Sequence, residues 1–176
     1  AGSSNTNGIS SCLHFGTHAL NYFQKRAQEI RIYTLGYYIS AGSSADGRDV
    51  FSGGNDWDRI DYSGRTGALD IDVTVAGGDG EAGENDNVLP DFERIDGGSG
   101  SDIIKGGGRD EYITGGGSTG NDTLWGRGGS DTLDGNEGND ILVGHEGYDI
   151  FYGDGGDDSV SALDGGEDWI DCGSSA

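Results

Sequence analysis

A nine-residue repeat fills the C-terminal half of the chain and constrains its fold more than any other feature. From Gly97 onward the blocks include GRGGSDTLD, GNEGNDILV and GHEGYDIFY. The sixth position of the blocks is acidic: Asp102, Glu111, Asp122, Asp131, Asp140, Asp149, Asp158 and Asp168. Two places after each acid stands an apolar residue: Ile104, Ile113, Leu124, Leu133, Leu142, Phe151, Val160 and Ile170. A repeat this short cannot bury its own apolar face, so successive blocks must stack on one another.

Glycine at the first, second and fourth positions of a block is typical of a tight turn. It permits positive φ angles and lets another backbone approach closely. The three residues around the apolar position predict a short strand with that side chain inward. Such a turn directs several carbonyl oxygens to one side, where those of the fourth-position glycines become candidate metal ligands: Gly100, Gly120, Gly129, Gly138, Gly147 and Gly156.

Two blocks then form one coil of about 18 residues with a turn on each side, so blocks two apart share a side. One column of acids contains Asp102, Asp122, Asp140 and Asp158, and the other contains Glu111, Asp131, Asp149 and Asp168. Calcium takes about six to eight oxygen ligands, which two stacked turns can supply and one cannot. We therefore expect about six full calcium sites, one between each pair of stacked turns, with weaker partial sites at the ends.

The pattern Gly-Gly-x-Gly-x-Asp-x-apolar-x resembles the RTX family of calcium-binding parallel β-rolls, over roughly 75 residues. The resemblance implies an all-β fold, a right-handed parallel β-roll, with calcium bound as multiple ions. A glycine-rich disordered tail would share the low hydrophobicity and high charge. Disorder does not require the strict apolar column, so we favour the roll.

The residues before Gly97 divide into two further regions. In residues 1–43, apolar spacing from Thr17 to Ile30 predicts a short helix, and residues 30–40 predict a strand. Residues 44–96 begin with a degenerate coil in which Asp49 and Asp58 stand nine apart and are candidate ligands. The calcium-binding roll itself is assigned to residues 97–171.

The remainder of the middle region interrupts the period. In residues 68–75, strict alternation predicts a half-buried strand with Leu69, Ile71, Val73 and Val75 on one face. Residues 77–87 form an acidic loop. Its carboxylates could hold one more cation, or could simply face solvent: Asp79, Glu81, Glu84 and Asp86.

Charge limits the partners of this chain. Its net charge is −22 over 176 residues, which argues against nucleic acid and anionic membrane surfaces and in favour of bound cations. Stacked acids repel one another without those cations, so folding should be coupled to calcium. No apolar run is long enough to span a bilayer, so no membrane insertion is expected. Cys12 and Cys172 could pair within one molecule, pair between molecules, or remain thiols.

The sequence contains no convincing catalytic constellation, and we expect a non-catalytic protein. GGGSTG (115–120) matches both a nucleophile elbow and a dinucleotide fingerprint. Both motifs need a strand leading into a helix, whereas here the repeat continues on each side. His14 and His18 are four apart, but the glutamate of a metalloprotease helix does not follow His14.

These features favour an extracellular calcium-binding roll, secreted or at the cell surface, with a structural role in a surface layer, adhesin or filament. The alternative is a secretion, folding or polysaccharide-contacting module of a larger RTX enzyme or toxin. Family members usually carry a flank after the repeats, whereas this sequence stops soon after Asp171. We therefore expect possible self-association through the termini, with strand 30–40 of one subunit covering the open edge of the next.

Overall fold

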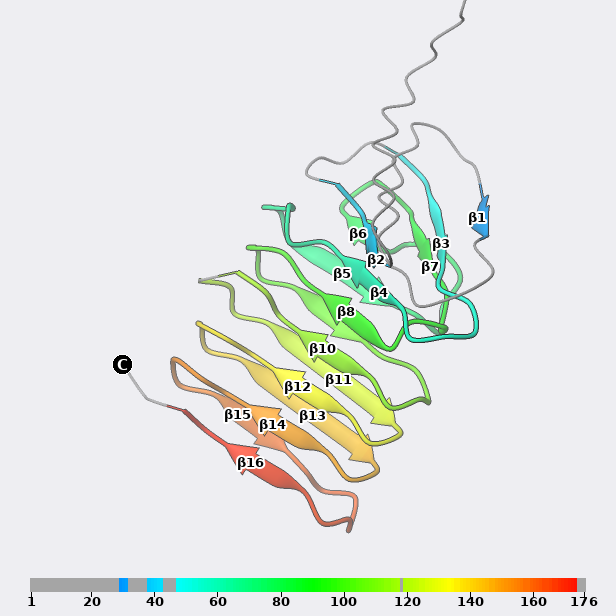
Figure 1. Cartoon of the computed structure of the whole chain (residues 1–176). Coiled ribbons are helices and arrows are strands. Elements are labelled where there is room, and N and C mark those ends of the chain that lie inside the picture. The colour runs from blue at the N-terminus through cyan, green and yellow to red at the C-terminus, as the bar shows by residue number, and fades with distance from the viewer. Residues whose placement is uncertain (1–28, 32–37, 43–46, 118, 174–176) are drawn as a thin grey trace, which may run out of the picture.

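The nine-residue period is realised as coils of two short strands, and these coils stack into parallel sheets (Figure 1). The structure is a computed structural model that describes residues 29–31, 38–42, 47–117 and 119–173. Every regular element in these residues is a β-strand. The expected all-β parallel solenoid is therefore confirmed.

Two sheets form the walls of the roll. The seven-stranded sheet contains, in spatial order, β16 (Trp169–Asp171), β14 (Ile150–Tyr152), β12 (Thr132–Asp134), β10 (Tyr112–Thr114), β8 (Arg94–Asp96), β4 (Arg59–Asp61) and β2 (Tyr38–Ser40). The six-stranded sheet contains β15 (Ser159–Ser161), β13 (Ile141–Glu146), β11 (Thr123–Gly128), β9 (Ile103–Lys105), β5 (Leu69–Asp72) and β6 (Gly80–Glu81). All neighbours in these two sheets pair in parallel except β5 and β6.

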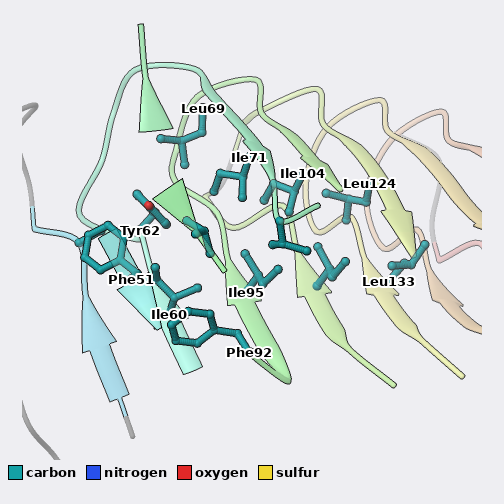
Figure 2. Packing of buried hydrophobic residues seen from close by; sticks show 14 of the residues in the cluster. Phe51, Ile60, Tyr62, Leu69, Ile71, Phe92, Ile95, Ile104, Leu124 and Leu133 are labelled. Carbon is teal, nitrogen blue, oxygen red and sulfur yellow. The ribbon is translucent and has the colours of Figure 1, made fainter. Parts of the chain in front are cut away.

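The core is a double column of apolar side chains between the sheets (Figure 2). The register places the eighth residue of each repeat directly on its equivalent, as in Ile113 on Leu133 and Leu124 on Leu142. These four side chains are fully buried, as are Ile104 and Phe151. Full burial of such a side chain contributes about 1.5–3 kcal/mol, so the apolar column holds the coils together.

The last coil departs from this pattern. Val160 is only partly buried, and Ile170 is 45% exposed although it stands at an inward position. No strand among the described residues stacks beyond β16, so Ile170 has a neighbour on one side only.

A third sheet covers the N-terminal end of the roll. It contains β1 (Glu29–Arg31), β3 (Val50–Ser52) and β7 (Asn87–Val88), paired in parallel in that order. Beneath it, Phe51 packs edge-on against Tyr62, with ring centroids 6.2 Å apart, and Phe92 is buried nearby (Figure 2).

The expected N-terminal segment is described only in part. Within the predicted strand 30–40, β2 and most of β1 are strands, which pair with β4 and β3 respectively, and residues 32–37 between them lie outside the described residues. Glu29 and Ile30, the last residues of the predicted helix, lie in β1, and the rest of that helix lies outside the described residues. Strand pairing with β3 therefore overrides the helical spacing at Glu29 and Ile30, and the rest of the predicted helix stays a prediction.

The alternating segment 68–75 forms a strand as expected, but a shorter one. β5 joins the six-stranded sheet beside β9 and buries Leu69 and Ile71. Val75 was expected on the same face, yet it is 56% exposed. The chain turns after β5, where Val75 N–H donates to the Asp72 carbonyl, and this turn carries Val75 away from the core.

Candidate metal centre

The acids before the six-stranded sheet form one continuous column. Asp102 N–H donates to Asp122 Oδ1 at 2.8 Å, Asp122 N–H to Asp140 Oδ1 at 2.7 Å, and Asp140 N–H to Asp158 Oδ1 at 2.9 Å. Each carboxylate is therefore positioned by the backbone of the preceding coil. The structure brings these four residues together as the period predicted.

The acids before the seven-stranded sheet form the second column by the same contact. Glu111 N–H donates to Asp131 Oδ1, Asp131 N–H to Asp149 Oδ1, and Asp149 N–H to Asp168 Oδ1, each at 2.9 Å. Together the two columns contain six intervals between stacked acids.

The second oxygen of these carboxylates is what makes the columns a candidate cation site. It is buried without a hydrogen-bond partner in Glu111, Asp131, Asp140, Asp149 and Asp158. A buried carboxylate oxygen without a partner is costly, and a bound cation would remove that cost. The residue types present therefore fit a hard, oxygen-binding cation.

The first glycine of each turn makes room for this oxygen. A side chain at Gly126 would overlap Asp131 Oδ2, and one at Gly144 would overlap Asp149 Oδ2. Glycine at this position therefore allows the carboxylate to fold back over its own turn.

The fourth-position glycines bring the backbones of stacked turns into contact. A Cβ on Gly138 would overlap the Gly120 carbonyl oxygen, and one on Gly156 would overlap that of Gly138. The equivalent overlaps are Gly147 with Gly129, and Gly120 with Gly100. The carbonyl oxygens of the expected glycines thus lie between turns, beside the acids.

Burial changes the acidity of the columns. It raises the pKa of Asp122 to about 7, helped by the neighbouring carboxylates of Asp102 and Asp140, although the N–H donated by Asp102 opposes the shift. Burial likewise raises the pKa of Asp140 to about 6. It also raises the pKa values of Glu111 and Asp131, which lie close together.

Carboxylates alone do not complete a coordination shell here. Among the described residues, no three His, Cys, Asp or Glu side chains converge on one point. Calcium also accepts backbone carbonyls and water, and carbonyls are what the glycine turns contribute.

The first acid of the six-stranded column is already satisfied. Asp102 Oδ1 accepts Leu69 N–H and its Oδ2 accepts Gly98 N–H, both at 2.8 Å. The strand stacked before it, β5, has no acid at the equivalent place, so the column ends there.

The two early candidates, Asp49 and Asp58, do not share a column. Asp58 precedes β4 and lies at the start of the seven-stranded column, where its N–H donates to Glu93 Oε2 at 2.8 Å. Asp49 precedes β3 in the third sheet. Asp49 therefore lies outside the two roll columns, and the prediction that both acids begin one coil of the roll stays a prediction.

Glu93 is the column residue that the sequence analysis missed. It stands nine residues before Asp102 and two before the buried Ile95, which is the signal that could have found it. Its other oxygen, Oε1, pairs with Arg109 Nη1 at 2.6 Å. A side chain of the protein therefore supplies the cation at this level.

The acidic loop is not simply solvated. Asp79, Glu84 and Asp86 are buried, and Glu81 is partly buried. Cys172 is an exposed free thiol, whereas Cys12 lies outside the described residues. The described part of the chain contains no helix that could cross a membrane.

Comparison with known families agrees with this geometry. The RTX calcium-binding nonapeptide repeat matches in four copies, over residues 43–64, 90–118, 117–142 and 134–170, which together cover more than half of the chain. The chain therefore belongs to this family of calcium-binding β-rolls. Its repeats bind calcium, several ions to an array. No curated protein matches the chain at a significant level.

Proposed function

We propose that calcium binding drives the folding of this roll, and that the folded roll serves as an extracellular structural module. The observation that carries the proposal is the buried, unpartnered oxygen repeated along both columns. Without cations these carboxylates repel one another and lack solvation, so the unfolded chain is favoured. Calcium concentrations outside cells are high enough to saturate weak sites of this kind, which occupy the millimolar end of the calcium range.

Circular dichroism tests the folding step. The calcium-free chain should give an unordered spectrum at neutral pH, and added calcium should produce β-signal. Magnesium should substitute poorly, because it demands a small octahedral shell and retains its waters. A full β-spectrum in chelator would reject the proposal.

The proposed ligands are the column carboxylates and the carbonyls of the fourth-position glycines. Each of the six intervals combines two stacked acids with carbonyl oxygens from both turns. Glu93 extends the second column toward Asp58, but Arg109 neutralises it, so we assign no ion to that level.

Self-association is a finer proposal, and it rests on the edge at β16. All three residues of β16 are exposed, Trp169 and Ile170 at 43% and 45%. An exposed edge strand can pair with another chain. Because β1 and β2 already pair within their own chain, β16 is the better surface. Light scattering at millimolar calcium tests this: Ile170→Lys should abolish association, and a monomeric parent chain would refute it.

Polysaccharide contact is a second candidate, favoured by one surface feature. Tyr152 and Trp169 lie edge to face at 5.3 Å on the seven-stranded sheet, next to Asp171. Trp169 is exposed and Tyr152 is half-buried, and an exposed ring beside a carboxylate suits sugar stacking and hydrogen bonding. Trp169→Ala should abolish retention on immobilised polysaccharide, whereas Trp57→Ala, an exposed tryptophan before β4, should not. Equal retention of both variants would argue against this role.

A further inference from the structure

The third sheet contains an acid pair with the same contact as the roll columns. Asp49 precedes β3 and Asp86 precedes β7, and Asp49 N–H donates to Asp86 Oδ1 at 2.9 Å. Asp86 is 1% exposed, and its Oδ2 is buried without a hydrogen-bond partner. A carboxylate oxygen so deeply buried needs a proton or a cation.

Glu84 Oε2 lies near Asp86 Oδ2, and both oxygens lie close to the backbone of Gly80. A Cβ built on Gly80 would stand 3.1 Å from Asp86 Oδ2 and 2.6 Å from Glu84 Oε2. The two oxygens therefore both border the position that a side chain of residue 80 would occupy, and Glu84 Oε2 is held there by the Glu81 N–H at 2.7 Å. Gly80 has a φ of +95°, so a side chain is disfavoured there on conformational grounds as well.

The neighbouring charges leave Asp86 as the uncompensated group. The buried Arg65 pairs through Nη1 with Glu84 Oε1 at 2.7 Å, so its charge is matched by that of Glu84. Asp79 accepts backbone N–H groups from Asp72 and Val88, both at 2.7 Å. Among the described residues, the Asp86 carboxylate accepts the N–H of Asp49 and forms no ion pair, and Arg65 acts on it only as a nearby charge that is paired with Glu84.

We propose that a calcium-class cation binds between Asp86 Oδ2 and Glu84 Oε2, in the space over Gly80. The remaining ligands are backbone carbonyls and water. This site lies outside both roll columns and between the matched repeats, which stop at residue 64 and resume at residue 90. It would fasten the loop around Gly80 to β7, and thereby hold the third sheet over the end of the roll.

Native mass spectrometry tests the site, because it gives the number of calcium ions bound to the folded molecules separately from the unfolded ones. Asp86→Asn keeps an oxygen for Asp49 N–H but removes the charge, and it should bind one calcium fewer than the parent chain. Asp70→Asn is the matched control, since Asp70 is an exposed acid on β5 and should retain the full number. Equal numbers for Asp86→Asn and Asp70→Asn would overturn the site.

Two further arms separate this site from the roll. Asp140→Asn should lose calcium whether or not the Asp86 site exists, so its result reports on the proposed function alone. Calcium anomalous scattering from crystals of the unaltered chain needs no substitution. A peak beside Gly80 supports the site, and its absence at saturating calcium overturns it even where Asp86→Asn fails to fold.

Discussion

In the five successive turns from Gly116 to Asp154, the second residue adopts a left-handed backbone conformation whether or not it is glycine. Gly116 has a φ of +90°, and the equivalent residues Arg127, Asn136, His145 and Asp154 have φ between +61° and +79°. Asn and Asp tolerate this region, whereas other side chains pay about 1–2 kcal/mol. Arg127 recovers part of that cost by pairing with both oxygens of Asp72 at 2.8 Å.

Among the described residues, His145 forms no ion pair of this kind and makes an edge contact with Trp125, with ring centroids 6.5 Å apart. We therefore expect His145→Gly to stabilise the calcium-loaded roll by about 0.5–1 kcal/mol, after allowing for the greater freedom of glycine in the unfolded chain. Urea unfolding at saturating calcium measures this. Asn136→Gly is the control and should not stabilise, because Asn136 Nδ2 donates to Thr114 Oγ1 and Asp134 Oδ1. Equal gains in both variants would contradict the argument.

At the scale of the elements, the columns depend on acids that share both neighbours. Asp140 accepts the N–H of Asp122 and donates its own N–H to Asp158, so it borders two intervals. Asp140→Ala should therefore weaken two calcium sites. Asp102→Ala should weaken fewer, because both oxygens of Asp102 already accept N–H groups. Titration calorimetry gives the number of ions bound, and equal losses would contradict the stacked geometry.

The columns also predict how pH acts on the calcium-free chain. Burial raises the pKa of Asp122 to about 7 and that of Asp140 to about 6, from an ordinary value of 3.8. A raised pKa in the folded state means that stability is present below about pH 4 and is lost as the pH rises through 6 to 7. Without calcium, β-signal should therefore be stronger at pH 5 than at pH 8. With calcium the order should reverse, because protons compete for the same oxygens.

Circular dichroism across this range checks both signs. Sodium chloride at matched ionic strength controls for simple screening of the negative charge. A calcium-free β-signal that grows from pH 5 to pH 8 would show that the buried carboxylates are not the groups that oppose folding.

The nine-residue period predicted the columns because residues two repeats apart lie next to each other in the stack. Acids 18 to 20 residues apart, such as Asp140 and Asp122 or Asp131 and Glu111, fall next to each other whatever the intervening side chains are. Glu93 also stands 18 residues before Glu111, but the glycines of the repeat do not precede it, so the repeat pattern did not reveal it. Asp86 joins Asp49 through the long-range pairing of β3 and β7. No local pattern in the sequence specifies that pairing.

At the scale of the whole molecule, lysine and arginine are absent from the last coils of the roll. All ten lysine and arginine residues lie at or before Arg127, whereas acids continue to Asp171. In the described N-terminal coils, basic side chains neutralise buried or half-buried acids, as Arg65 does for Glu84 and Arg94 for Asp96. The coils beyond Arg127 contain no lysine or arginine for this purpose, so we expect their carboxylates to depend on calcium.

This asymmetry predicts the order in which the roll loses structure as calcium is withdrawn. The exposed coil at β15 and β16 combines the least burial with no lysine or arginine, so its backbone amides should lose protection at the highest calcium concentration. The strands β4 and β8, bridged by Arg59 and Asp96, should remain protected longest. Hydrogen exchange at a series of calcium concentrations measures this order directly. Glu137 and Asp154 line the same pocket, so Glu137→Lys places a positive charge beside Asp154. In this variant the amides of β14 should stay protected down to a lower calcium concentration than in the parent chain. Simultaneous loss of protection in all strands would instead show that the roll folds as one cooperative unit, in which the position of the basic residues has no influence.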